Sequence, residues 1–257
     1  MLTIRNLSFA RDTVRILHDI TLAPITGRQL VGLLGPNAAG KSTLLRCMAG
    51  ELAGRGRIEI DGCQLASLSR RERASAIAYM PQTPPQPSTL TAWELLRSAA
   101  EVTGVRNSHE AIQLLLIDLG LAVDAFRPLA ALSGGKRQLA GLALALMREP
   151  RVLLLDEPTA ALDLFWRMRV LDLVRRRIGD AEAAAMVAFH DIELAARYSD
   201  RLIMLDAGHV VADGPPAEVL TRASIARLYR VEADVTIRDD GNVAVHLLKP
   251  VEETSPC

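Results

Sequence analysis

The sequence predicts an α/β fold that carries an antiparallel β part near its start and an all-helical insert near its middle. Short, continuous apolar runs, such as residues 152–155, are typical of strands buried on both faces of a parallel sheet. Residues 2–9 and 57–60 instead alternate apolar and polar side chains, as half-buried strands do. A proline-rich hinge at residues 83–87 separates the sheet-forming sequence from a stretch with helical periodicity.

Composition limits the class of protein. The chain has 257 residues, of which 49% are hydrophobic and 23% are charged, so we expect one large globular domain or a core with a subdomain. Its 30 basic and 30 acidic residues give a net charge of zero, so no overall field attracts nucleic acid or anionic lipid. The arginine run at residues 175–177 is interpreted as a solvated helix face.

Cysteine usage and hydropathy indicate the compartment. Cys47, Cys63 and Cys257 are scattered without a C-x-x-C pair, so neither a disulfide framework nor a zinc site is predicted, and a reducing cytoplasm fits. The N-terminus lacks a signal-peptide core. The longest apolar run, residues 139–147, is far shorter than the roughly 18 residues that cross a bilayer. We therefore expect any membrane role to come through a partner.

The N-terminal part is predicted to combine antiparallel strands with one strand of the parallel sheet. Residues 16–25 are interpreted as a strand pair, and Asp61-Gly62 is a hairpin signal. Residues 29–34 are apolar and short enough for a buried strand. Residues 69–76 predict a short exposed helix.

A glycine-rich segment, GPNAAGKST, follows residues 29–34 and fits the pattern G-x-x-x-x-G-K-[ST] of a phosphate-binding loop. Residues 43–49 continue with helical spacing, which supplies the strand–loop–helix context that the motif needs. Backbone N–H groups and the positive helix end then face a triphosphate, with Lys41 at the β and γ phosphates and Ser42 on Mg²⁺. The predicted nucleotide-binding residues of the loop are Gly35, Pro36, Asn37, Ala38, Ala39, Gly40, Lys41, Ser42 and Thr43.

Two carboxylates end the buried run at residues 152–155. Adjacent acids at the end of such a strand are unfavourable unless they hold a cation or a water molecule. Asp156 suits Mg²⁺, and Glu157 is placed to orient an attacking water as a general base. The alternative is a pair of solvated acids in a turn, which fits poorly with so apolar a preceding run.

Two further polar side chains follow predicted strands. Gln82 comes after residues 77–80, at the edge where open α/β sheets bind ligands, although position alone favours a solvated loop glutamine. His190 comes after residues 185–189 and is able to donate a hydrogen bond to phosphate. A lone histidine at such a place is more often a satisfied structural residue.

Residues 88–130 are predicted to form the all-helical insert. Thr91 and Glu94 match a capping box at the start of one helix, and Ser108 is expected to cap a second. Trp93 is expected to pack in the core and otherwise to contact a partner.

A second glycine-rich helix start, LSGGKRQ, follows the insert. Ser133, Gly134 and Gly135 precede an apolar periodic run and leave N–H groups at a helix start, which predicts an anion site separate from the first loop. Taken alone, the segment is better interpreted as an ordinary glycine-rich N-cap. The remaining predictions are helices at residues 167–177, 192–197 and 216–220, hairpins at 201–212 and 235–247, and a frayed tail at 250–257.

Together these segments resemble the ATP-binding-cassette ATPase family. Six features occur in the order that the family shows, and the match covers residues 2–220. They are the phosphate loop, Gln82, LSGGKRQ, LLLDEP, the ALD segment that ends at Asp163, and His190. The LSGG-x-x-Q pattern is the specific part, because general phosphate-loop proteins lack it. The resemblance implies a RecA-like P-loop NTPase core with an antiparallel β subdomain (residues 1–87 and 131–222), a helical subdomain (88–130), and a C-terminal hairpin and tail (223–257) within a single domain.

The resemblance also implies an ATP-hydrolysing site shared between two copies. One copy would hold ATP and Mg²⁺ through its phosphate loop, Gln82, Asp156, Glu157 and His190. The catalytic residues would be Glu157, His190 and Gln82. The residues that bind Mg²⁺ would be Ser42, Gln82 and Asp156. Ser133, Gly134, Gly135 and Gln138 of the other copy would close over the γ-phosphate, and Asp163 of the ALD segment would be a further nucleotide contact.

The implied function is the ATPase subunit of a bacterial importer for an iron chelate, haem or cobalamin. Its partners would be transmembrane permease subunits, a second copy of itself and a solute-binding protein, at the cytoplasmic face of the inner membrane and without nucleic acid. The alternative is a soluble cassette protein that acts on nucleic acid or the ribosome. The neutral charge and the absence of a long coiled-coil insertion disfavour that alternative.

Two positions depart from the family's pattern. Arg11 occupies the place where an aromatic side chain often stacks on adenine, so the base contact is expected from Arg11 or Phe9. Ala38 occupies a loop position that is commonly glycine. If the backbone there needs a positive φ, alanine would destabilise the loop by roughly 1–2 kcal/mol.

Overall fold

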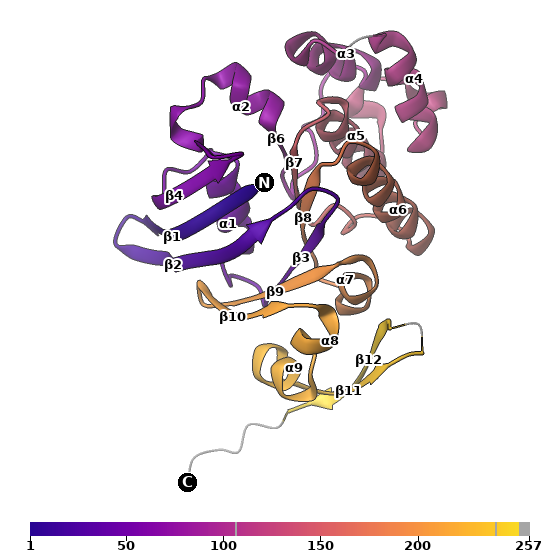
Figure 1. Cartoon of the computed structure of the whole chain (residues 1–257). Coiled ribbons are helices and arrows are strands. Elements are labelled where there is room, and N and C mark those ends of the chain that lie inside the picture. The colour runs from indigo at the N-terminus through magenta and orange to yellow at the C-terminus, as the bar shows by residue number, and fades with distance from the viewer. Residues whose placement is uncertain (106, 240, 252–257) are drawn as a thin grey trace.

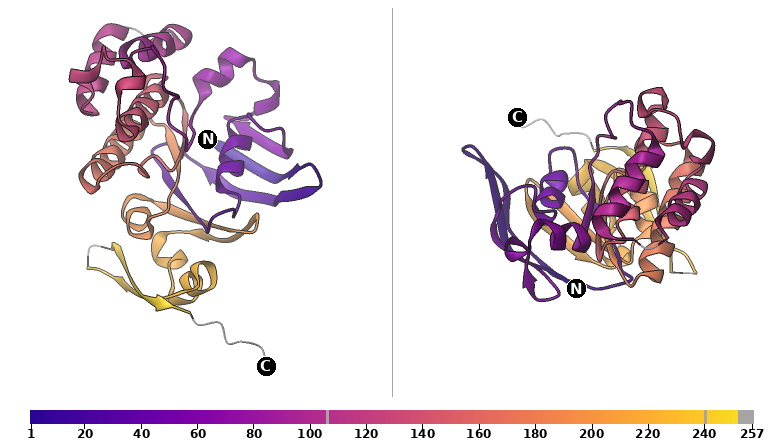
Figure 2. Two further views of the ribbon diagram at one scale, coloured as in Figure 1. Left: turned by 180° about the vertical axis from the view of Figure 1, so that it is seen from behind. Right: turned by 90° about the horizontal axis from the view of Figure 1, so that it is seen from above.

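The computed structural model describes residues 1–105, 107–239 and 241–251, and Figure 1 shows their arrangement. The described residues form a six-stranded sheet, a separate four-stranded sheet and a two-stranded C-terminal hairpin. In Figure 1 the four-stranded sheet lies to the left of the large sheet, while the helical insert lies at the top and the C-terminal hairpin at the bottom. The reverse view in Figure 2 shows the same separation of insert and hairpin.

The large sheet is parallel except at one edge. Its strands, in order across the sheet, are β10 (His209–Gly214), β9 (Arg201–Asp206), β3 (Leu30–Leu34), β8 (Ala184–Ala188), β7 (Val152–Asp156) and β6 (Ile77–Met80). Only the β10–β9 pair is antiparallel among these described neighbours. In β7, Leu153 and Leu155 pack with the helices on one face, whereas Val152 and Leu154 belong to the core on the other. Both faces are covered, which explains why the strand is continuously apolar.

The four-stranded sheet is antiparallel and corrects one prediction. Its strands are β2 (Val14–Ile25), β1 (Leu2–Arg11), β4 (Arg55–Ile60) and β5 (Cys63–Gln64). The interpretation of residues 16–25 as two strands is wrong, because β2 pairs with β1 along its whole length. The pair contains register shifts, and at one of them the Ser8 hydroxyl donates to the Asp19 carboxylate at 2.7 Å while Asp19 has a φ of 48°. Such a bulge breaks the alternation that marks a single strand.

Helix α1 (Lys41–Met48) packs between the two sheets. Its Leu44, Leu45 and Met48 are fully buried in one core with residues of β1, β2, β3, β7 and β8. The phosphate loop therefore projects from the join between the antiparallel sheet and the large sheet. Helix α2 (Arg70–Ala76) and the short turn η1 (Leu65–Ser67) connect β5 to β6.

The helical insert contains α3 (Ala92–Thr103), α4 (Ser108–Asp118) and the turns η2 (Ala122–Asp124) and η3 (Leu129–Ala131), packed against α5 (Gly134–Met147). The predicted capping box is confirmed, because Thr91 accepts from the Glu94 N–H and Glu94 accepts from the Thr91 N–H. The predicted cap at Ser108 is wrong. Asn107 precedes the helix with a φ of 49°, a left-handed conformation that asparagine tolerates well, and Ser108 is the first helical residue.

The C-terminal half adds α6 (Leu164–Asp180), α7 (Ile192–Tyr198), α8 (Pro216–Val219), α9 (Arg222–Tyr229) and the hairpin of β11 (Val231–Ile237) and β12 (Val243–Pro250). Helix α6 begins earlier than predicted, because the Asp163 carboxylate accepts from the Trp166 N–H and caps it. Helix α9 was not predicted. The terminal hairpin is confirmed. The tail predicted at residues 250–257 starts too early, because Pro250 still belongs to β12, and residues 252–257 lie outside the described residues. None of the described helices combines the length and apolarity that crossing a bilayer requires.

Candidate nucleotide-binding and hydrolysis site

The loop between β3 and α1 has the backbone geometry of a phosphate cradle. Gly40 precedes α1 with a φ of 104°, and no side chain caps the helix start. The first N–H groups of α1 therefore lack a side-chain acceptor, which is the arrangement that binds anions at helix N-termini. A Cβ atom at Gly35 would lie 2.3 Å from the Leu205 carbonyl oxygen, so the loop can pass this close to β9 only with glycine.

Ala38 adopts the positive φ that the sequence analysis considered for this loop position. Its φ is 65°, in the left-handed region that disfavours alanine by roughly 1–2 kcal/mol. The neighbouring Ala39 is 3% exposed and packs in the core beneath the loop. The loop keeps its shape despite the departure from glycine, but with local strain at Ala38.

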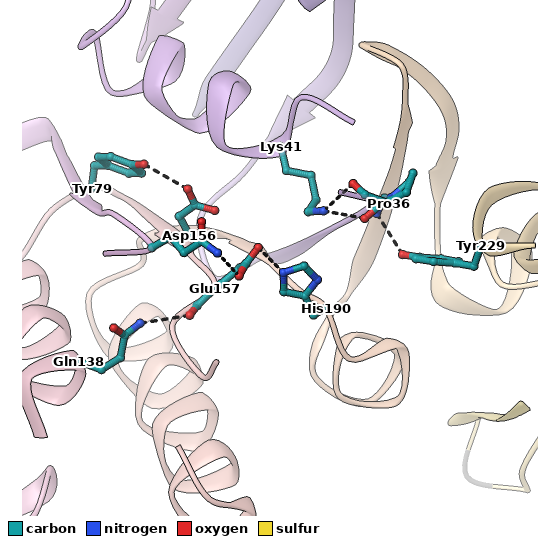
Figure 3. Close-up of polar contacts among 10 residues, drawn as sticks. Pro36, Lys41, Tyr79, Gln138, Asp156, Glu157, His190 and Tyr229 are labelled. Carbon is teal, nitrogen blue, oxygen red and sulfur yellow. Dashed lines mark hydrogen bonds and ion pairs between the residues drawn. The ribbon is translucent and has the colours of Figure 1, made fainter. Parts of the chain in front are cut away.

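Lys41 is buried and folds back onto its own loop. Its Nζ atom donates to the carbonyl oxygen of Gly35 at 2.6 Å and to that of Pro36 at 3.1 Å, as Figure 3 shows. Burial lowers the pKa of Lys41, and the negative charges of Glu157 and Asp156 oppose that shift. The Lys41 side chain is therefore already held against the phosphate loop, with the carboxylates of Glu157 and Asp156 near its ammonium group.

Asp156 ends β7 in a position suited to a divalent cation. It is 1% exposed, and the Tyr79 hydroxyl donates to its Oδ2 atom at 3.2 Å. Within the described part of the chain, its buried Oδ1 atom has no hydrogen-bond partner. Burial raises the pKa of Asp156, while hydrogen bonding from Ser42 and Tyr79 opposes the rise. An unpartnered carboxylate oxygen close to a serine hydroxyl fits Mg²⁺, which prefers hard oxygen ligands.

Mg²⁺ also fits because it needs few protein ligands. The described residues contain no cluster of three or more histidine, cysteine or carboxylate side chains that could cage a metal. Mg²⁺ is usually held by one or two carboxylates together with substrate phosphates and water. Asp156 and Ser42 are the residues that would hold it here, where it would neutralise phosphate charge.

Glu157 points away from Asp156 and is held by two side chains. Its Oε2 atom accepts from Gln82 Nε2 at 2.7 Å. Its Oε1 atom lies 2.5 Å from His190 Nε2, as Figure 3 shows. The residue is 7% exposed and has a φ of 53°, so the backbone turns sharply between the two acids. The structure thus brings together the three residues that the sequence proposed for catalysis, from the ends of β6, β7 and β8.

A cavity of about 950 Å³ joins these parts. It is lined by the loop from Asn37 to Thr43, by Gln82, Glu157 and His190, and by residues of β2. Those β2 residues are Val14, Arg15, Ile16 and His18. The expected base contacts, Arg11 and Phe9, are not among the described lining residues; Phe9 instead packs against the core of the antiparallel sheet. The strand register exposes Arg15 to the cavity in place of Arg11.

The LSGGKRQ segment lies apart from this cavity. Ser133 caps α5 by accepting from the Lys136 N–H at 3.3 Å, and both Ser133 and Gly134 are exposed. None of the described cavity-lining residues comes from this segment. The next residue, Gly135, is packed so that a Cβ atom there would lie 3.0 Å from the Ala161 carbonyl oxygen. The glycine-rich helix start is therefore available on the surface beside the ALD segment.

Two predicted nucleotide contacts have other partners within the chain. Gln138 is 1% exposed, and its Nε2 atom donates to the backbone oxygen of Glu157 at 3.2 Å. Buried in this way, it does not share the exposed surface of Ser133. Its expected contact with nucleotide held by a second copy stays a prediction. Asp163 is exposed and caps α6.

Sequence reasoning missed several polar contacts around the site. Tyr79 donates a hydrogen bond to Asp156, but the sequence predicts it only as one residue of a strand. Asp124, 2% exposed, pairs with Lys136 of the LSGGKRQ segment at 2.6 Å and with Arg127 at 2.8 Å, and so ties the insert to the start of α5. The Tyr79–Asp156 and Asp124–Lys136 pairs leave no local pattern, because their partners come from different elements.

The phosphate cradle follows β3, and the two carboxylates Asp156 and Glu157 lie at the end of β7, two strands away in the same sheet. This combination defines the class of P-loop nucleotide hydrolases. The sequence profile of the ABC transporter family matches residues 17–160, and this chain belongs to that family as an ATP-binding, ATP-hydrolysing protein.

Relatives and solved structures agree with that assignment. The hemin import ATP-binding protein HmuV of Bordetella avium is 40% identical over 242 residues, covering 90% of this chain and 92% of the relative. HmuV of Pseudomonas putida is 38% identical over 244 residues, covering 90% and 93%. A solved ATP-binding subunit of an ABC transporter is 29% identical with a TM-score of 0.80, covering 89% of this chain and 98% of that one. A metal-chelate type ABC transporter in an inward-facing conformation shares the fold at 22% identity, with a TM-score of 0.78 and 98% coverage of both chains.

Proposed function

We propose that this chain is the ATPase subunit of an importer whose cargo is haem or a similar metal chelate. The cargo class is supported by the names of its relatives, which are hemin import ATP-binding proteins. The chemistry is supported by one observation above others: Glu157 is held between Gln82 and His190 at the mouth of the phosphate cradle. That arrangement suits a general base that must orient one water molecule toward a phosphate.

The contacts within the site suggest how each side chain acts. With ATP bound, Lys41 and the N–H groups of the loop neutralise and orient the phosphates, and His190 turns from Glu157 to donate to the terminal phosphate. Glu157 is then free to accept a proton from the attacking water, while Gln82 keeps its carboxylate in place. Asp156 and Ser42 would hold Mg²⁺, which would neutralise charge on the phosphates.

We propose that two copies complete the site. Ser133 and Gly134 are exposed at a helix start and lie outside the cavity of their own chain. A second copy related by a two-fold axis could present them to the phosphates bound by the first, and the same contact would be repeated in the other site. ATP would then favour the closed pair, because it contacts both copies only in that state.

We propose that the helical insert docks a permease, which would hold the chain at the cytoplasmic face of the inner membrane. Phe126 is 72% exposed, and its ring centroid lies 5.4 Å from that of Trp93. The Trp93 ring also meets His109 edge-on, with the ring centroids 4.6 Å apart. Exposed aromatic clusters are common at protein interfaces. A solute-binding protein is proposed as a further member of the complete system.

The replacement of Glu157 by glutamine tests the chemistry. Glu157→Gln keeps the shape of the side chain but removes the base, so we expect Mg-ATP to bind with unchanged affinity while turnover falls about 10²–10⁴-fold. Glu182→Gln is the matched control, because Glu182 is exposed and pairs only with Arg28 among its described contacts. Near-normal turnover of Glu157→Gln would contradict the assignment of the base.

The cargo is tested in a strain that lacks this chain. Growth on haem as the iron source should be lost, restored by the unchanged chain and not by Glu157→Gln. Unimpaired growth on haem, or co-purification of the chain with ribosomes or DNA and no permease, would contradict the importer.

A further inference from the structure

Gly35, the first residue of the phosphate loop, is bonded to the C-terminal part of the chain. Its backbone N–H donates to the Tyr229 hydroxyl at 3.0 Å, across 194 residues of sequence. Figure 3 shows Tyr229 and Lys41 reaching this part of the loop from different sides. Gly35 belongs to the phosphate-loop motif, but Tyr229 lies outside all the sequence motifs of the site.

The Gly35 residue is therefore fixed at both of its polar groups. Lys41 binds the carbonyl oxygen at 2.6 Å, and Tyr229 accepts from the N–H. Gly35 is buried, and a buried N–H without an acceptor is destabilising by about 1–3 kcal/mol. Close packing against Leu205 leaves the loop little room to turn this N–H elsewhere.

Tyr229 is held by a C-terminal unit that consists of α9, β11 and β12. Ile225 and Leu228 of α9 are buried in the same core as Val245 of β12 and Ala195 of α7. Burial raises the pKa of Tyr229 to about 12, so the phenol stays protonated at physiological pH. The hydroxyl is thus presented to the loop by packed secondary structure and not by a free tail.

The same unit borders His190. Tyr229 lies between a cavity of about 710 Å³, lined also by Asp191 and Val245, and one of about 570 Å³, lined also by Pro36 and Asn37. His190 lines both cavities. The C-terminal unit consequently contacts the phosphate loop directly and adjoins the histidine that follows β8.

We propose that Tyr229 is a positioning residue for the phosphate loop, through which the C-terminal unit sets nucleotide affinity. The inference rests on the nucleotide site proposed above. In that site, Lys41 must direct its ammonium group to the phosphates of the bound substrate, which weakens its hold on the Gly35 carbonyl. Tyr229 then becomes the main anchor of Gly35, so its hydroxyl stabilises the loaded loop more than the empty one.

Nucleotide binding by Tyr229→Phe tests this difference. The variant keeps the ring and loses only the acceptor, so we expect the Kd for Mg-ATP to rise about tenfold. KM should rise by a similar factor, with kcat within about twofold of the unchanged chain. Tyr198→Phe is the matched control, because the buried Tyr198 donates its hydroxyl to Asp172 at 3.1 Å and lies outside the lining of the nucleotide cavity.

A merely structural tyrosine would give a different result. Both variants lose one hydrogen-bonded, part-buried hydroxyl and should lower Tm by similar amounts, but only Tyr229→Phe should weaken nucleotide binding. Amide exchange at the β3–loop junction should accelerate in Tyr229→Phe, more so with nucleotide bound than without. Unchanged affinity in Tyr229→Phe, or an equal loss in Tyr198→Phe, would overturn the proposal. Failure of the unchanged chain to bind Mg-ATP would instead overturn the site on which the proposal rests.

Discussion

The Nε2 atom of His190 lies 2.5 Å from the Oε1 atom of Glu157, so the side chain proposed to contact phosphate is paired with the proposed base. The two come from consecutive positions across the sheet, at the ends of β8 and β7. In the mechanism proposed above, productive binding would separate this pair, because each side chain would then have its own partner in the reacting complex. On that proposal the pair is a resting arrangement of the site.

Replacement of His190 by alanine should lower kcat by about 10²-fold or more, the scale expected when a positioned hydrogen-bond donor to the reacting group is lost. Binding of Mg-ADP, which lacks the terminal phosphate, should change little. Steady-state phosphate release and ADP binding by fluorescence measure the two effects. His246→Ala on the exposed part of β12 is the control, and an equal loss of ADP binding in His190→Ala would contradict the assigned contact.

Asp156 should make stability depend on pH and on Mg²⁺. Burial raises the pKa of Asp156, so the folded chain binds this proton more tightly than the unfolded chain does. Its contribution to the free energy of unfolding therefore falls as pH rises from the unfolded pKa of about 3.9 through the higher folded pKa, and stays low above it.

Asp156→Asn should consequently raise Tm by about 2–4 °C at pH 7 without Mg²⁺, which corresponds to about 1 kcal/mol in a chain of this size. The difference should shrink as pH approaches 4, and Mg-ATP should stabilise the variant less than the unchanged chain. Thermal unfolding across this pH range measures both trends. Asp118→Asn, at a more exposed carboxylate that pairs with Arg176, is the control; a destabilised Asp156→Asn at pH 7 would count against the cation site.

Ala38→Gly should stabilise the loop. A φ of 65° disfavours alanine by roughly 1–2 kcal/mol, and the greater freedom of glycine in the unfolded chain offsets about half of that gain. We expect a net increase of about 0.5–1 kcal/mol in the free energy of unfolding, measured in urea. Ala39→Gly provides the contrast, because Ala39 is buried and should lose stability when its methyl group is removed. A loss of stability in both variants would show that the conformation of residue 38 does not limit the loop.

Arg15 should contribute to base binding in place of Arg11. Arg15 lines the nucleotide cavity, and an arginine that stacks on an aromatic base at an exposed site is worth about 0.5–1 kcal/mol. Arg15→Ala should therefore weaken ATP binding about two- to fivefold and leave the affinity for inorganic tripolyphosphate, which has no base, almost unchanged. Arg11→Ala should alter neither. Calorimetric titration of both ligands distinguishes a base contact from a phosphate contact.

Local sequence predicted the elements whose signals come from near neighbours. The phosphate loop, the capping box at Thr91 and the buried strand that ends at Asp156 each depend on residues within a few positions, and each is present as expected. The bulged pairing of β2 and the helix start at Asn107 were misread, because bulges and left-handed starts interrupt periodicity without ending an element.

The sequence by itself determined which groups are available: a glycine loop with Lys41, two acids after a buried strand, and a glutamine and a histidine after neighbouring strands. The tertiary structure decided how they meet. Gln82 reaches Glu157 across 75 residues and Tyr229 reaches Gly35 across 194, whereas Gln138 is turned inward and Arg11 is left off the cavity. These contacts depend on strand order and register, which arise from packing of the whole core and leave no mark in any short stretch of the chain.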